Sequence, residues 1–112
     1  MNPRIALLSL LFVPVLAGGL AAQTGTPKEL YDASCKKCHG VLGVPPKAMK
    51  EKFPKLAVFD AAFIAKRSED SIVKVLTKGK GDDMKSFKEK LTPAEIVSVA
   101  KYVKELATRP RS

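Results

Sequence analysis

The sequence of 112 residues predicts an all-α fold, and three features of the chain support this prediction. Residues Thr26–Glu29 and Thr92–Glu95 share one pattern, in which proline follows threonine and glutamate stands three positions after the threonine. These threonine and glutamate side chains can satisfy the free backbone N–H groups at the beginning of a helix. Apolar residues then recur three or four positions apart, as one face of a helix requires. No segment alternates apolar and polar residues as a half-buried strand would.

The first expected helix begins at Pro27 and ends at Gly40, because glycine commonly follows the last turn of a helix. One side of this helix is predicted to carry Leu30, Tyr31, Ser34, Cys35 and Cys38. Residues 41–54 contain three prolines and are expected to form a loop with a single helical turn.

The second half of the chain is expected to hold two shorter helices and a longer terminal one. Asp60 can cap a short helix over residues 61–66, and Ser68 can cap another that ends at Gly79. The terminal helix begins after Thr92, and Pro110 prevents its continuation. Its apolar face is predicted to consist of Ile96, Val99, Ala100, Val103 and Ala107.

The first 22 residues have the organisation of a secretory signal peptide. Arg4 is the only early charge, residues 5–16 are almost wholly apolar, and small residues follow. We expect cleavage near Ala21 or Ala22, a single mature domain of residues 23–112, and a periplasmic or otherwise exported protein. Retention of the segment as a membrane anchor is the weaker alternative, because the apolar run is shorter than the ~20 residues that span a bilayer.

The mature chain is basic, since 19 lysine and arginine residues against 11 acidic ones leave a formal charge of +8 without Arg4. The charges are distributed along the chain, and no basic patch is interleaved with aromatic residues, so nucleic acid is not an expected partner. The basic surface suits an acidic protein partner, although lysines that only keep the protein soluble would look the same. Contact with a membrane is expected only if the signal segment is retained.

Cys35, Cys38 and His39 lie within the stretch CKKCH, and three kinds of chemistry use such a group. A structural zinc site needs four ligands, usually in two separated pairs, and the chain has no further cysteine or histidine. A thioredoxin-like dithiol normally opens a helix after a strand, whereas no strand is predicted before this motif.

Covalent haem explains all three residues, because C-x-x-C-H is the attachment pattern of c-type haem. The thiols of Cys35 and Cys38 stand one helical turn apart and can add to the two vinyl groups on one porphyrin edge. His39 follows them directly and can bind the iron. The sequence therefore predicts one covalently attached haem c, with a dithiol redox protein as the less favoured alternative.

The second axial ligand of the iron cannot be another histidine of this chain, since His39 is the only one. Methionine is the usual alternative in electron-transfer cytochromes. Met1 belongs to the signal segment, which leaves Met49 and Met84 as candidates.

Three stretches resemble class I cytochromes c, especially the short bacterial ones: ELYDASCKKCHG, EDSIVKVLTKGKG and MKSFKEKLTPAEIVSVAKYVKEL. The last contains the family's order of ligand methionine, aromatic residue, leucine, helix cap, acidic residue and tyrosine, at Met84, Phe87, Leu91, Thr92, Glu95 and Tyr102. The resemblance implies terminal helices packed together, with shorter helices and loops around one haem. It also implies that Cys35 and Cys38 attach this haem, that His39 is the proximal ligand, and that Met84 is the distal one. Lys85 departs from the family, which commonly has proline there.

With both axial positions occupied, the expected function is electron transfer, without catalytic residues. The alternative is a haem sensor or small peroxidase in which Met84 does not bind and the sixth position is open. The expected partners are a reductase and an oxidase or dehydrogenase with acidic docking surfaces. The lysines expected to meet them are Lys36, Lys37, Lys78, Lys80, Lys85, Lys88 and Lys90. The apolar residues expected to cover the haem are Leu30, Leu56, Phe59, Ile72, Leu76, Phe87, Leu91, Val99 and Val103.

Overall fold

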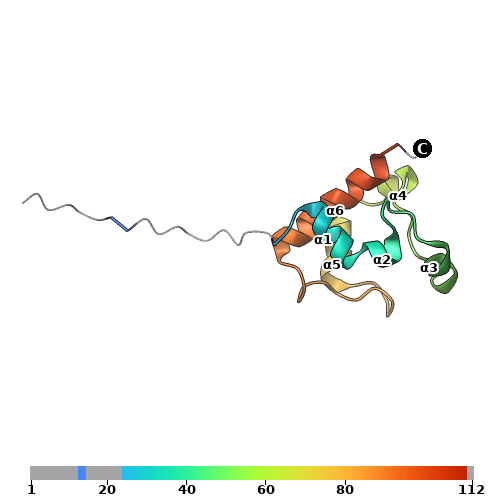
Figure 1. Cartoon of the computed structure of the whole chain (residues 1–112), viewed down its shortest axis with the longest axis horizontal. Helices are drawn as coiled ribbons and strands as arrows, with labels where there is room; N and C mark the ends of the chain where they lie inside the picture. Colours follow the sequence, from blue (N-terminus) through green and yellow to red (C-terminus); the bar gives the residue numbers. More distant parts are fainter. Residues whose placement is uncertain (1–12, 15–23, 111–112) are drawn as a thin grey trace, which may run out of the picture.

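The computed structural model describes residues 13–14 and 24–110. Helices form the framework of the folded part of the chain (Figure 1). Their order is α1 (Pro27–Ser34), α2 (Lys36–His39), α3 (Lys47–Lys52), α4 (Ala61–Lys66), α5 (Glu69–Lys78) and α6 (Pro93–Thr108). Within these residues the only β pairing is an isolated bridge between Lys80 and Met84, so the all-α prediction is confirmed.

The predicted signal segment falls almost wholly outside the described part of the chain, and so does its cleavage site near Ala21 or Ala22. Among the residues that are described, none of the helices has the length and apolar character needed to cross a bilayer.

Helix α6 is the central element, and α1, α4 and α5 each contact it. The five residues predicted for its apolar face are all buried in the core. At the crossing of the terminal helices, Tyr31 of α1 packs against Tyr102 of α6 with ring centroids 5.3 Å apart. In Figure 1, α5 lies just below this crossing, and α2 and α3 lie to the right of α1. The predicted pairing of the terminal helices is therefore confirmed.

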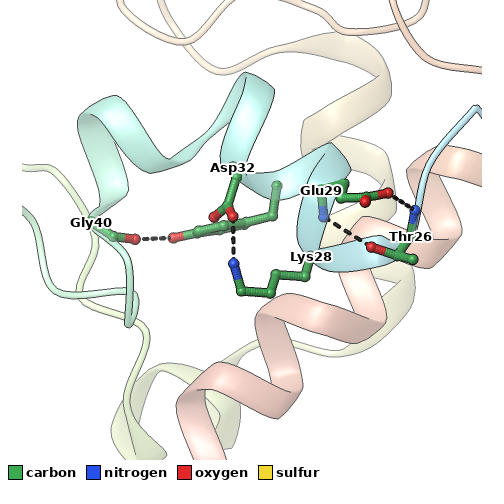
Figure 2. Close-up of polar contacts among 6 residues, drawn as sticks. Thr26, Lys28, Glu29, Asp32 and Gly40 are labelled. Atoms are coloured by element: carbon green, nitrogen blue, oxygen red, sulfur yellow. Dashed lines mark hydrogen bonds and ion pairs between the residues drawn. The ribbon is translucent and has the colours of Figure 1, made fainter.

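The helices begin where their caps predict. At α1 the Oγ1 of Thr26 accepts a hydrogen bond from the N–H of Glu29, whose carboxylate accepts one from the N–H of Thr26 (Figure 2). Thr92 and Glu95 form the same reciprocal pair at α6. Glu95 also accepts a hydrogen bond of 2.8 Å from the hydroxyl of Thr24, which ties the N-terminal segment to α6. The hydrogen bond from the N–H of Thr92 is the main cause that holds the pKa of Glu95 below its usual value.

The first helix differs from the prediction, because it is interrupted at Cys35. The backbone there has φ −126° and ψ −37°, far from the helical φ of about −63°. Two short helices result, so that Cys38 and His39 belong to α2. Tyr31, Ser34, Cys35 and Cys38 nevertheless line the same cavity, as their predicted position on one side requires. The predicted end at Gly40 is correct, since this residue caps α2 with φ +83°.

Candidate functional site

A cavity of about 870 Å³ lies beneath α1 and α2, next to α5 and α6. Cys35, Cys38, His39 and Met84 all line it, and Met49 does not. Seven of the nine apolar residues expected to cover a haem also line it: Leu56, Phe59, Ile72, Leu76, Phe87, Val99 and Val103. The other two, Leu30 and Leu91, are buried in the core beside them. A separate depression between α4, the beginning of α5 and Lys104 contains none of the four predicted site residues.

Both cysteines carry free thiols that face this cavity. Cys35 is buried, and its burial raises the pKa of its thiol to about 12. A dithiol oxidoreductase needs a thiol with a lowered pKa that is accessible to its substrate. The position at a break between two helices also differs from the strand-to-helix turn on which such motifs lie. Both features argue against the dithiol alternative.

His39 is the last residue of α2 and is largely surrounded by protein. Burial lowers the pKa of its imidazole, while the backbone of Ala57 acts in the opposite direction. Its Nδ1 is fully buried and, within residues 24–110, has no hydrogen-bond partner of ordinary geometry. Burial thus favours the neutral imidazole, which is the state in which a histidine nitrogen can bind a metal.

Gly40 and Tyr31 fix the backbone directly after His39. Tyr31 is fully buried. Its hydroxyl donates a hydrogen bond of 2.7 Å to the carbonyl of Gly40 (Figure 2). A Cβ at Gly40 would collide with the backbone oxygen of Val44, and its φ of +83° favours glycine. Sequence reasoning recognised Gly40 as a helix end but gave no sign of the contact with Tyr31.

Met84 is presented to the cavity by a loop that is tied down on both sides. Before it, the N–H of Lys80 donates a hydrogen bond of 2.8 Å to the carbonyl of Met84 itself. After it, the N–H of Phe87 donates one of the same length to the carbonyl of Leu76 in α5. Class I cytochromes c commonly have proline directly after the ligand methionine, and this chain has Lys85 there. The two hydrogen bonds hold the loop without that proline.

The donor set is therefore two thiols, one imidazole and one thioether around an apolar cavity. No cluster of three histidine, cysteine or acidic side chains that could hold a bare metal ion occurs in the described residues. A large apolar prosthetic group that is attached through sulfur fits these side chains, and a structural zinc ion does not.

Comparison with known proteins agrees with this chemistry. Residues 22–103 match the model of the family described as cytochrome c oxidase, cbb3-type, subunit III. The chain belongs to this cytochrome c family. It is a class I, mono-haem c-type cytochrome, and it binds one haem c covalently.

Two solved structures are similar to this cytochrome over most of its length. The KustC0563 c-type cytochrome is 33% identical with a TM-score of 0.67, and the match covers 75% of this chain and 100% of that one. A tyrosine-to-phenylalanine mutant of Kustc0563 is 32% identical with a TM-score of 0.65, covering 73% and 99% of the two chains. No curated protein sequence shows significant similarity to this cytochrome. Together with the family match, these structures confirm the class I cytochrome c fold and a haem protein of the electron-carrier type.

The charged side chains of the cavity lining form its mouth, where six basic residues outnumber the single acidic one, Asp83. The lining includes Lys80, Lys85 and Lys90, which were predicted from the sequence, and also Lys52, Lys55 and Arg67, which were not. The other predicted lysines, Lys36, Lys37, Lys78 and Lys88, are exposed but do not line the cavity. Lys52, at the end of α3, and Lys55, just after it, were missed because no sequence pattern in this segment fixes its position relative to the cavity.

Proposed function

We propose that this cytochrome carries single electrons between redox proteins, with Cys35 and Cys38 bonded to the haem and the iron held between His39 and Met84. The single observation that carries the proposal is the meeting of these four side chains at one apolar cavity. When bound, the haem supplies a one-electron couple between ferric and ferrous iron. With two protein ligands on the iron, no position is left for oxygen, peroxide or a substrate.

The chain's own residues would tune this couple in two ways. A thioether ligand raises the reduction potential of haem iron relative to a second histidine. The apolar lining from α5 and α6, with Ile72, Leu76 and Val99 buried below 8% exposure, keeps water away from the site. A dry, low-dielectric surrounding disfavours the more highly charged ferric state and so raises the potential further.

Optical spectra of the protein purified from its own host test this proposal directly. We expect a Soret band, a near-red sulfur-to-iron band in the ferric form, and no rapid binding of carbon monoxide by the ferrous form. A haem sensor or peroxidase with an open sixth position would lack the near-red band and bind carbon monoxide rapidly. A colourless protein with two reactive thiols would instead support the dithiol alternative.

Export to the periplasm or beyond is part of the proposal. It is supported by the order of basic, apolar and small residues in the first 22 positions. Export is also compatible with covalent attachment of haem, because an exported chain that has not yet folded presents both free thiols.

We further propose an acidic docking face on the partners, which would be a reductase and an oxidase or dehydrogenase. The six basic residues at the mouth of the cavity support this, since opposite charge steers partners toward the haem. Shortly after His39 in the sequence, Val41, Leu42 and Val44 are exposed by 57%, 52% and 47%, in a turn closed by a hydrogen bond from the N–H of Gly43 to the carbonyl of Gly40. Such a turn usually carries polar residues, so its apolar side chains suit contact with a partner.

Charge reversal of Lys85 and Lys90 tests the docking proposal. At low salt, the Lys85→Glu, Lys90→Glu variant is expected to transfer electrons about tenfold more slowly to an electrode coated with a carboxylate-terminated monolayer. The difference from the natural chain should disappear as ionic strength rises, because salt screens exposed charges. The matched control is Lys101→Glu, an exposed residue of α6 outside the cavity lining. Equal slowing by the control, or rates independent of ionic strength, would contradict steering by the cavity lysines.

A further inference from the structure

We propose that Phe59 sets the rotational orientation of the His39 imidazole and is therefore a positioning residue for the proximal ligand. This inference rests on the proposed function, in which His39 binds the iron. It concerns how the ring is held and which part of the chain holds it.

The two rings are stacked face to face. Their centroids are 4.7 Å apart, and their planes are inclined by only 18°. Both side chains line the haem cavity, and Phe59 is 6% exposed. A flat face at this distance resists rotation of the imidazole about its bond to Cβ, because any large rotation would drive the ring edge into Phe59.

Phe59 is itself held from several directions. Its backbone N–H donates a hydrogen bond of 2.8 Å to the carbonyl of Gly43. Gly43 leaves room for its side chain, since a Cβ at that glycine would lie 2.7 Å from the Cβ of Phe59. On the other side, Phe63 of α4 packs against it with ring centroids 5.0 Å apart. Phe59 can therefore act as a fixed wall.

The stacking acts together with a backbone contact of the same ring. The ring of a metal-binding histidine is ordinarily oriented by a hydrogen bond at the nitrogen that does not bind the metal. For His39 the neighbouring group is the backbone of Ala57, which opposes the lowering of the imidazole pKa by burial, although Nδ1 has no hydrogen bond of ordinary geometry within residues 24–110. Stacking on Phe59 restrains rotation of the ring in addition to this contact.

The experiment is proton NMR of the ferric holoprotein, in which the spread of the four haem methyl shifts reports the planes of the axial ligands. Phe59→Leu retains apolar bulk and removes the flat face, so we expect a changed order or a narrowed spread of these shifts. Gly43→Ala pushes on Phe59 from outside the cavity, and we expect a change in the same signals. Leu106→Val is the control, because Leu106 is 1% exposed and buried in α6 but does not line the cavity.

The outcomes separate this inference from the proposed function. Methyl shifts in Phe59→Leu that match the natural protein would overturn the inference, and so would an equal change in Leu106→Val. If Phe59→Leu yields no holoprotein, Gly43→Ala decides in its place by the same criterion. A natural protein without the spectrum of histidine-ligated, low-spin iron would contradict the proposed function itself, before any variant is compared.

Discussion

A chain with both Cys35→Ser and Cys38→Ser is expected to be exported colourless and largely unfolded. In the proposed function these two thiols attach the haem, so without them the cavity of about 870 Å³ has no permanent occupant. The cavity lies within the core, because Ile72, Leu76 and Val99 line it and are also among the most buried residues of the domain. Losing the haem therefore removes the centre of the core.

The expected effect is large because the cavity is large for so small a domain. An apolar cavity that is left unfilled costs stability, and the cost grows with the volume that does not collapse. Small domains have a total stability of about 5–15 kcal/mol, so even partial loss is enough to unfold the chain. Small domains that are organised by a bound metal behave in this way when the metal is removed.

Far-ultraviolet circular dichroism of the double variant gives the measurement. We expect most of the helical signal of the natural protein to be lost, together with its cooperative thermal transition. The single variants Cys35→Ser and Cys38→Ser are the controls, because each keeps one thiol for attachment and should keep colour and intermediate stability. Native helicity in the colourless double variant would show that the polypeptide folds without haem.

The helix boundaries could be predicted because they depend on neighbouring residues. Thr26, Asp60, Ser68 and Thr92 each bond to a backbone N–H three positions along, and all four begin a helix where the sequence predicts one. The buried face of α6 is likewise a matter of spacing along one element. The break at Cys35 was missed, because apolar periodicity carries no sign of a change in the backbone angles of a single residue.

The candidate site shows the same limit. Cys35, Cys38 and His39 could be chosen from one short pattern, and the resemblance to class I cytochromes c selected Met84. The contact between His39 and Phe59 joins residues 20 positions apart through a loop that carries no recognisable pattern. Only the folded chain shows that this loop places an aromatic face against the imidazole and basic side chains at the mouth of the cavity.

Replacement of Met84 by alanine is expected to lower the reduction potential more than any other single substitution outside the attachment motif. Axial ligands set haem potentials over a range of about 0.8 V, and a thioether lies toward its upper end. Met84 lines the cavity, and hydrogen bonds from Lys80 and Phe87 hold its loop, so the loop should keep its path in the variant. The result should be an open sixth position in a folded protein.

Three measurements follow from this expectation for Met84→Ala. The near-red sulfur-to-iron band should disappear, the midpoint potential should fall, and the ferrous protein should bind carbon monoxide. Met49→Ala is the matched control, since Met49 is partly buried in α3 but does not line the cavity. If Met49→Ala removed the near-red band and Met84→Ala kept it, the ligand would be Met49. If neither variant changed the band, the sulfur ligand would not be a methionine of residues 23–112, because Met49 and Met84 are the only methionines in that range.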